Sequence, residues 1–507
     1  MKVNRSKIIA IGLVCILFGS IISGLATRTI TDTSDTVYTM ITNSKGNSWT
    51  ATGANLRTAY YDLNGTGGTV YVPPGTFYMV KQILLTNKTC IQGSGMGVTI
   101  IKIGSGFSAG VNDLFLARVS GGATDSFNNI TIRDLTINGN GTTTGLLYNV
   151  GIKDFVFQNI EMTNSAGNGI AVNKGSGAKR GLITNCRAIG FTSATLQPFD
   201  LTNLENSVIS NCIVTVSGIW GFDFHCLKNC TISNIQVHKG AYGVKFFGDT
   251  GEWGGNNTVS NVVIEGCTGA SGSSMWITRE YNSSFSNINI RGGVYTGLVL
   301  TTSAYITITG LYIDHKTTGD KCIQTDSGTH HITISNGFAR LPKASRTCLS
   351  LNNANNWTIS NFEFYGAQND QTINAVKNCV FSNCKFVFGT YGVALEESSF
   401  VKFIGCDFSY NSIDGFECGI GTVNTNYSVV DCNFIANAGK GMDIEGDSNI
   451  TILGCLFKDN AGDGIECNAV DSVMIKDCIM WGDPFDDNIV GSNNQTGTAY
   501  NIGMTII

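Results

Sequence analysis

A short motif recurs along the chain at nearly constant spacing and limits what the chain can fold into. A β-favouring residue is followed by a small or polar turn and a cysteine, as in Ile-Thr-Asn-Cys at 183–186 and Phe-Ser-Asn-Cys at 381–384. The later cysteines, at 384, 406, 432, 455 and 478, follow one another at intervals of 22 to 26 residues. Repeats of this length bury their apolar faces by stacking on their neighbours, so the motif predicts a repeat architecture.

A second motif lies between the cysteine motifs: glycine, then apolar, any and apolar residues, as at 221–224 and 441–444. Its alternation has the period of a strand, whereas helical repeats would show spacings of three and four. The frame of leucine-rich repeats is missing, and a propeller blade is nearly twice as long. We therefore predict an all-β fold: a single-stranded right-handed parallel β-helix with three sheets, coils of about 22–26 residues and an N-terminal cap.

The recurring cysteine occupies an apolar position of the repeat. Stacked coils bring equivalent residues above one another, so these cysteines are expected to form an interior ladder of free thiols. An even count of 16 cysteines beyond Cys15 also permits disulfides. Local bridges between Cys226 and Cys230, and between Cys379 and Cys384, are the alternative.

The N-terminal segment has the pattern of an export signal. Three basic residues precede an apolar run over 8–26 that ends in the small residues Gly24 and Ala26. We expect a signal peptide at 1–26, with an uncleaved membrane anchor as the alternative, and a secreted or cell-surface protein that is not embedded in the membrane once the signal is removed. The further predicted parts are a linker at 27–45, a cap with the first coils at 46–105, the β-helix at 106–490 and a tail at 491–507. A short helix is expected at 54–63 within the cap.

The predicted cap contains Gly-Gly-Thr-Val-Tyr-Val-Pro-Pro-Gly-Thr-Phe-Tyr at 67–78, followed by Gly-Ser-Gly-Met-Gly at 93–97. This stretch resembles the opening of β-helices of the pectate lyase superfamily, and the repeats continue that resemblance to about residue 490. The resemblance implies the fold and a polysaccharide partner. Members of the superfamily include lyases, hydrolases, epimerases, phage tailspikes and proteins that only bind, so the fold leaves the activity open.

Charge limits the partners of the protein. Charged residues make up 14% of the chain, the net charge is -5, and no basic stripe of the kind that nucleic-acid binders carry is present. We therefore expect no nucleic-acid partner. An acidic polysaccharide remains a suitable partner if local cations contact it.

Strand alternation places the variable residues of the glycine motif on the outer surface, in a column along the coils. A mixed cluster within this column contains Asp200, Asp223, His225, Lys245, Trp276 and Arg279, and Gln324 follows further along. The segment Trp-Gly-Phe-Asp-Phe-His at 220–225 resembles the Tyr-Gly-Phe-Asp-Pro-His strand of alginate C5-epimerases. Asp223 and His225 match that family's Asp and His. Trp220, Phe224 and Cys226 replace its Tyr, its Pro and the acidic residue that usually follows.

These residue types suit removal of a proton from C5 of a uronic acid. In this hypothesis Lys245 and Arg279 neutralise the uronate carboxylate, and His225 exchanges the proton. Asp223 orients His225 or holds a cation, for which Ca²⁺ is the candidate cofactor. Asp200, Trp276 and Gln324 contact the substrate. A solvated strand face with incidental charges is the alternative.

An acidic cluster lies further along the same column, at Glu396, Glu417, Asp443, Glu445 and Glu466. Carboxylates on neighbouring coils would lie about 5 Å apart, a separation that suits either a glycoside hydrolase or a Ca²⁺ site. Repulsion between like charges at this distance would also raise the pKa of some of these carboxyl groups. A hydrated acidic stripe is the alternative. Gly-Asp-Lys-Cys at 319–322 resembles the Gly-Asp-Asp-Cys strand of polygalacturonases, but that family's other motifs are missing. His330 and His331 are expected to point to opposite sides of an extended chain.

Three functions follow: lyase or epimerase chemistry at the mixed cluster, hydrolysis at the acidic cluster, or non-catalytic glycan binding at a surface.

Overall fold

The computed structural model describes residues 40–108, 113–117, 127–173, 178–269, 272–315, 320–326, 328–341, 347–366, 371–419, 423–468, 470–482, 489–491 and 501–506. The predicted signal peptide, and the linker as far as residue 39, lie outside the described residues. The part from Met40 to Ile507 forms one compact unit. Within the described ranges, no helix is both long and apolar enough to cross a membrane.

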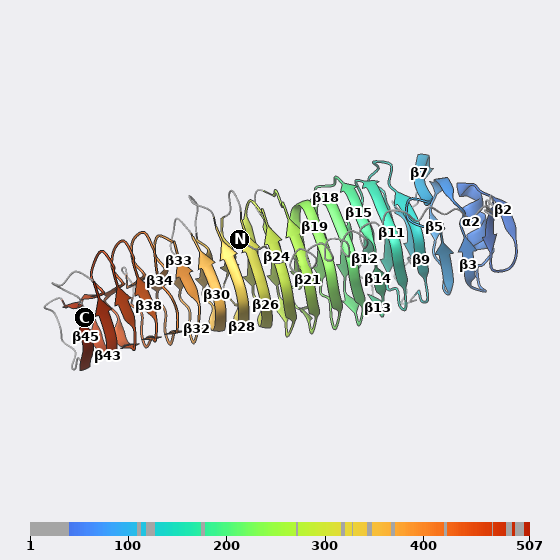
Figure 1. Cartoon of the computed structure of the whole chain (residues 1–507). Coiled ribbons are helices and arrows are strands. Elements are labelled where there is room, and N and C mark those ends of the chain that lie inside the picture. The colour runs from blue at the N-terminus through green and yellow to red at the C-terminus, as the bar shows by residue number, and fades with distance from the viewer. Residues whose placement is uncertain are drawn as a thin grey trace, which may run out of the picture. The chain divides into compact units, whose positions relative to one another are not determined.

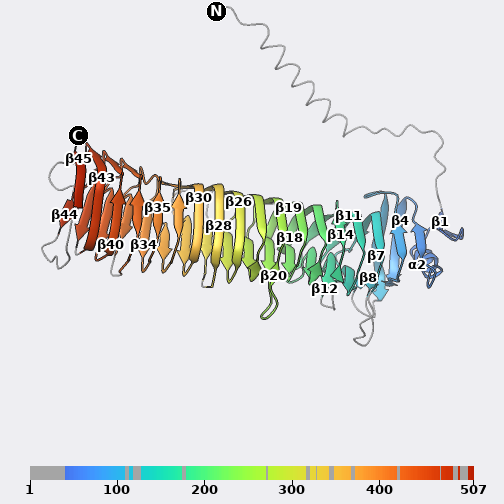
Figure 2. The ribbon, with the colours of Figure 1, turned by 90° about the horizontal axis from the view of Figure 1, so that it is seen from below.

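Nearly every described strand pairs in parallel with the strand one coil later, which confirms the predicted parallel β-helix (Figures 1 and 2). The ladder sheet, named for the column of site residues on its outer surface, consists of β5 (Ile83–Leu84), β8 (Asp113–Ala117), β10 (Gly145–Val150), β12 (Ile170–Asn173), β16 (Phe199–Thr202), the ends of β18 (Val208–His225) and β19 (Thr231–Phe247), β22 (Ser273–Thr278), β25 (Thr296–Thr301), β27 (Ile323–Thr325), β29 (Leu349–Asn352), β31 (Thr372–Asn374), β34 (Val393–Glu396), β36 (Phe416–Cys418), β39 (Met442–Glu445), β42 (Ile465–Asn468) and β44 (Ile489–Gly491).

The second sheet begins after a corner and bends into the third. Its strands are β3 (Gly68–Tyr71), β6 (Thr89–Gln92), β9 (Thr131–Asn138), β11 (Val156–Ser165), β14 (Leu182–Thr184), the starts of β18 and β19, β21 (Thr258–Glu265), β24 (Ser284–Arg291), β26 (Ala304–Asp314), β28 (His330–Arg340), β30 (Asn355–Tyr365), β32 (Val380–Ser382), β35 (Lys402–Ile404), β37 (Ser428–Val430), β40 (Ser448–Leu453), β43 (Asp471–Trp481) and β45 (Asn501–Ile506).

The third sheet continues the long strands of the second and adds separate strands. These are β4 (Gly75–Lys81), β7 (Thr99–Ser108), β15 (Arg187–Phe191), β33 (Lys385–Val387), β38 (Asn433–Ile435) and β41 (Leu456–Lys458). Short strands at the corner between the ladder sheet and the second sheet are β13 (Ala178–Lys179), β17 (Leu204–Glu205), β20 (Gly254–Gly255) and β23 (Glu280–Tyr281).

The cap covers the start of the first coils. Helix α2 (Gly53–Tyr61) agrees with the helix predicted at 54–63, and the Thr52 side chain caps its N-terminus by accepting a hydrogen bond from the Asn55 backbone N–H. Strands β1 (Met40–Asn43) and β2 (Ser48–Thr50) form an antiparallel pair beside it, and β1 also pairs with β3. The cap therefore covers the edge that the first coil would otherwise expose.

Asparagine explains the bend between the second and third sheets. Asn234, Asn261 and Asn287 on successive coils have φ angles of 53°, 55° and 53°, in the left-handed region that asparagine tolerates better than most residues. Each side chain also donates a hydrogen bond to the preceding one: Asn261 Nδ2 lies 2.9 Å from Asn234 Oδ1, and Asn287 Nδ2 lies 3.0 Å from Asn261 Oδ1. The turn is thus repeated in register from coil to coil.

The core contains columns of like side chains. The rings of Phe386, Phe408, Phe434 and Phe457 stack on consecutive coils, with centroids 4.8 to 5.2 Å apart. The sixteen cysteines of the described residues are free thiols, and all except Cys90 are buried. The expected interior ladder of thiols is therefore confirmed, and the alternative bridges from Cys226 to Cys230 and from Cys379 to Cys384 are not present.

The Asn261 rung tests how much the repeated turn contributes. Asn261→Ala loses both side-chain hydrogen bonds and keeps an unfavourable φ, so it is expected to lower the free energy of unfolding by about 2–3 kcal/mol. Asn261→Gly loses the same bonds but tolerates the φ, so its loss should be about 1 kcal/mol smaller. Urea unfolding followed by circular dichroism measures both. Equal losses in the two variants would show that the left-handed backbone contributes nothing.

Candidate functional site

The register of the ladder sheet brings the residues of the predicted mixed cluster onto successive coils. Asp200 pairs with Asp223, Asp223 with Lys245, and Lys245 with Trp276. In the parallel column two residues further along each strand, Thr202, His225, Phe247 and Thr278 follow one another. Side chains one coil apart are separated by about 4.8 Å. The predicted column is therefore present: Asp200, Asp223, Lys245 and Trp276 of the mixed cluster follow one another in it, and Phe247 follows His225 in the parallel column.

Asp223 and Lys245 form an ion pair at the centre of the mixed cluster. Lys245 Nζ lies 3.5 Å from Asp223 Oδ2, and the two side chains are 17% and 9% exposed. Gln197 Nε2 donates a weaker hydrogen bond to the same Asp223 oxygen at 3.4 Å. Burial raises the pKa of Asp223, and Lys245 and His225 only partly oppose that rise. A buried, cation-paired carboxylate of this kind is sensitive to any ligand that competes for the lysine.

The pKa of Asp200 is raised more than that of Asp223. Burial, and then the negative charge of Asp223 one coil away, raise the pKa of Asp200 from its ordinary value of 3.8 to about 6. Its oxygens accept hydrogen bonds from Thr202 Oγ1 at 3.3 Å and from Asn168 Nδ2 at 3.4 Å. Burial thus raises the pKa of both neighbouring carboxyl groups, but Asp200 faces the negative charge of Asp223 whereas Asp223 faces Lys245, and carboxyl groups in unequal surroundings are what acid–base chemistry uses.

His225 pairs with a residue that the sequence analysis did not select. Its Nε2 lies 3.1 Å from Asp249 Oδ1, within ion-pair distance if the imidazole is protonated, although the angle is not that of a hydrogen bond. Among the described residues no hydrogen bond or ion pair joins Asp223 to His225, although the charge of His225 lowers the pKa of Asp223. Asp223 pairs with Lys245 instead, and the segment at 248–253 brings Asp249 to the imidazole.

A mixed donor set surrounds His225. One ligand atom each from His225, Cys226 and Asp249 lie within 4.8 Å of one another. Nitrogen, sulfur and oxygen together suit Zn²⁺, whereas Ca²⁺ prefers six to eight oxygen ligands. Burial raises the pKa of the Cys226 thiol, so a metal bound there would have to displace its proton. These three residues thus suit Zn²⁺ better than Ca²⁺.

The other predicted residues, Arg279, Trp276 and Gln324, lie beside Phe247 or further along the column. The Phe247 ring has the Lys245 ammonium 4.3 Å and the Arg279 guanidinium 5.8 Å from its centre, so two cations flank one ring. Trp276 Nε1 donates to Thr301 Oγ1 at 3.2 Å, and its ring lies 6.3 Å from that of Trp220. Gln324 belongs to the same column, two coils beyond Trp276.

The acidic cluster is also a column, in which Ala394, Glu417, Asp443 and Glu466 follow on successive coils. Glu396 and Glu445 lie two residues further along their strands, and Glu445 pairs with Asn468.

The electrostatics of the acidic cluster differ from the expectation. Lys440 Nζ lies 2.7 Å from Asp443 Oδ2 and also forms an ion pair with Glu466. Burial tends to raise the pKa of Glu466, but hydrogen bonds from Lys440 and Asn468 outweigh it, so the pKa is lowered. Glu466 is therefore not among the carboxyl groups whose pKa repulsion raises, because Lys440 forms ion pairs with both Glu466 and Asp443.

The two adjacent histidines also differ from the expectation. His331 has a left-handed φ of 55°, so the two side chains do not alternate as in extended chain. Their Nδ1 atoms lie 2.8 Å apart. The prediction that they point to opposite sides is wrong for this reason.

Asp249 and Lys440 are the residues that sequence reasoning missed. Both lie in turns, where no strand periodicity marks them. For Asp249 a signal was available, because the chain is much longer between Lys245 and Trp276 than between Asp223 and Lys245, as an insertion beside the column requires.

Comparison with known proteins identifies the class of the fold. The family model "Rhamnogalacturonase A/epimerase, pectate lyase-like" matches residues 42–268, and the model "Right handed beta helix region" matches residues 347–502. The fold is a right-handed parallel β-helix whose N-terminal part matches a pectate-lyase-like family model, in agreement with the resemblance of its N-terminal and repeat motifs. No curated protein matches the chain.

Several solved structures are similar. The A-module of the mannuronan C-5 epimerase AlgE6 of Azotobacter vinelandii has 11% identity and a TM-score of 0.25, covering 90% of this chain and 94% of that one. The surface adhesin PfbA of Streptococcus pneumoniae has 13% identity and a TM-score of 0.33, covering 82% and 89%. An N-terminal fragment of gene product 12 of bacteriophage Phi29 has 13% identity and a TM-score of 0.39, covering 89% and 90%. These similarities assign no chemistry to the site.

The raised pKa of Asp200 predicts a pH-dependent stability. Because folded Asp200 holds its proton more tightly than the unfolded chain does, its stabilising contribution is complete below about pH 4 and is lost as the pH rises through about 6. Asn at this position stays uncharged at every pH, so Asp200→Asn does not lose stability as the pH rises. The melting temperature of the variant relative to wild type should therefore rise between pH 4 and pH 8.

Asp477→Asn is the matched control, because that side chain is 66% exposed. Its melting temperature should follow wild type throughout the same pH range. A constant difference between Asp200→Asn and wild type would contradict the assignment.

Proposed function

We propose that the protein acts on a uronate-containing polysaccharide and removes the proton at C5, in lyase or epimerase chemistry. The observation that carries the proposal is the mixed cluster itself, which sets a protonatable carboxyl, an ionic carboxylate, a lysine and a tryptophan on four consecutive coils. The expected export at 1–26 would bring the protein into contact with such a polymer outside the cytoplasm.

Charge supports an acidic substrate. Lys245 and Arg279 both lie beside Phe247, and together they can bind the carboxylate of one sugar ring. Neutralising that carboxylate makes the neighbouring C5 proton more acidic. Trp276, on the next coil, offers an apolar surface on which a sugar ring can stack.

The proton chemistry divides between two groups. His225 takes the proton from C5, and Asp249 stabilises the imidazolium that results. In a lyase, the electron pair then forms the C4–C5 double bond as the C4–O bond breaks, and protonated Asp200 gives its proton to the departing oxygen. In an epimerase, a proton returns to C5 from the opposite face and no bond between sugars breaks.

A glycoside hydrolase is the second candidate, and the unequal carboxyl groups favour it. Asp200 and Asp223 lie on neighbouring coils. The spacing of the coils, about 4.8 Å, is close to the separation of the two carboxyl groups in retaining glycosidases. The pKa of about 6 suits Asp200 as the acid. The acidic cluster supports hydrolysis less well, because Lys440 pairs with two of its carboxylates.

A scan with pectate, polygalacturonate and alginate distinguishes these functions. An absorbing unsaturated product marks a lyase, new reducing ends without it mark a hydrolase, and an altered uronate composition without cleavage marks an epimerase. A protein that binds one of these polymers and changes none of them is a non-catalytic glycan-binding protein, and this result would overturn the proposal.

Variants of the mixed cluster test the roles of its residues. His225→Ala is expected to lower kcat by about 10²–10⁴-fold, because the base for C5 is lost. Lys245→Met should lower kcat/KM on acidic polymers by about 10²-fold or more, because the uronate carboxylate is no longer neutralised. Lys402→Met, which removes an exposed lysine from β35, is the control and should leave turnover unchanged. Full turnover by His225→Ala would remove His225 from this role.

A further inference from the structure

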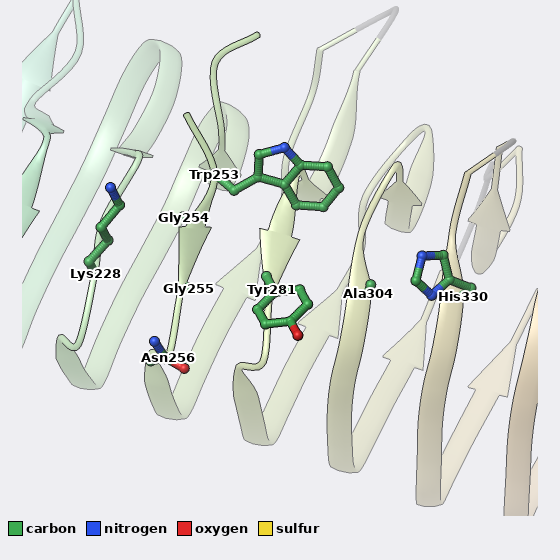
Figure 3. Close-up of a pocket in the computed structure, with 8 residues that line it drawn as sticks. All are labelled: Lys228, Trp253, Gly254, Gly255, Asn256, Tyr281, Ala304 and His330. Carbon is green, nitrogen blue, oxygen red and sulfur yellow. The ribbon is translucent and has the colours of Figure 1, made fainter. Parts of the chain in front are cut away.

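A second set of outward residues forms a column at the corner where the ladder sheet gives way to the second sheet. Lys228, Gly255, Tyr281, Ala304 and His330 are paired one after another along five coils. Gly255 and Ala304 are small, so gaps open between the larger side chains. The result is an open pocket of about 410 Å³, which Trp253, Gly254 and Asn256 also line (Figure 3). We call this pocket the corner groove.

Two glycines, Gly254 and Gly255, let neighbouring groups approach the backbone closely at the base of the corner groove. A Cβ added at Gly254 would overlap the carboxylate of Glu280, and one added at Gly255 would lie 2.6 Å from the carbonyl oxygen of Tyr281. Because neighbouring groups pack directly against the backbone of Gly254 and Gly255, the base of the corner groove is shallow, and the rings of Trp253 and Tyr281 project beyond it. These two rings remain 38% and 46% exposed, although aromatic rings favour burial.

Backbone strain beside the corner groove points to use of its aromatic surface. The residues that directly follow the corner column have left-handed φ angles, and asparagine occupies this position at 256, 282 and 356. Tyr305 and His331 stand there instead, with φ angles of 57° and 55°, and the bulky Tyr305 side chain disfavours such an angle whereas histidine tolerates it better. Their rings stack 4.6 Å apart, and Tyr305 contacts Tyr281 with centroids 5.2 Å apart. A costly conformation thus extends the exposed aromatic surface.

We propose that the corner groove is a second glycan-binding site, distinct from the mixed cluster, which holds sugar rings of a polysaccharide chain that runs along successive coils. Rings of the groove recur at the coil spacing of about 4.8 Å, which is close to the length of one sugar residue. The apolar faces of sugar rings stack on Tyr281 and Trp253, and their hydroxyl groups reach Asn256 and His330. Lys228 at one end of the groove supplies a cation for a sugar carboxylate. This preference of the groove for acidic sugars rests on the proposed function.

The corner groove and the mixed cluster are joined by one segment of chain. The residues from Gly248 to Trp253 carry Asp249, which contacts His225, and end at Trp253, which lines the groove. Arg279 likewise donates to the Gly248 carbonyl oxygen at 3.2 Å and is followed two residues later by Tyr281. A polymer held in the groove is therefore anchored next to the site of the proposed chemistry, so long chains should bind better than short ones.

Binding measurements with alginate and polygalacturonate test this proposal. Affinity electrophoresis should show that Tyr281→Ala and Trp253→Ala each weaken binding to the polymer that wild type retains by roughly ten-fold, which corresponds to one lost stacking contact. Tyr71→Ala removes a ring of similar exposure (48%) from β3 and should leave the affinity unchanged. Thermal melting checks that each variant remains folded.

The outcomes separate this proposal from the proposed chemistry. Lys245→Met should lose turnover and keep most of the polymer affinity, because the corner groove still binds. Wild-type affinity in both folded groove variants would overturn the second site, as would failure of wild type to bind either polymer. If the groove variants lose affinity and Lys245→Met keeps full turnover, the groove is supported and the proposed chemistry fails.

Discussion

Stacking of coils at a constant spacing is the constraint on which the whole structure depends. Each strand of the β-helix obtains its hydrogen bonds from the coils before and after it, so every coil must repeat the path of its neighbours. The path turns at positions with left-handed φ, and asparagine meets that requirement while its side chain donates a hydrogen bond to the asparagine of the preceding coil. Columns of phenylalanine and buried cysteine in the interior follow from the same repetition.

The same repetition that builds the core builds the functional surface. Each outward position of a coil lies beside residues that are some two dozen residues away in the sequence. A substitution there changes the surface without changing the backbone of the β-helix. Asp200, Asp223 and Lys245 meet in this way, and burial raises the pKa of both carboxyl groups while Lys245 opposes the rise chiefly at Asp223. Asparagine, serine and threonine occupy equivalent positions elsewhere in the column, at Asn352, Ser350 and Thr372, without comparable charge.

Departures from the repeat are where function is proposed. The insertion at 248–253 delivers Asp249 to His225 and Trp253 to the corner groove. Tyr305 and His331 take positions that favour asparagine. The left-handed φ of Tyr305 costs conformational energy, and such a cost is a reason to look for a use of the surface that its ring extends.

The period of the motifs and the alternation of the strands were sufficient to predict the β-helix, the buried cysteines and the membership of the ladder column, because strand alternation and coil stacking are local, regular rules. The tertiary structure alone decided which charges pair within and beside that column. Asp223 faces Lys245, His225 faces Asp249, and Lys440 neutralises part of the acidic cluster. Partner choice depends on side-chain direction and on turn residues outside the repeat, and neither follows a period that a sequence can display.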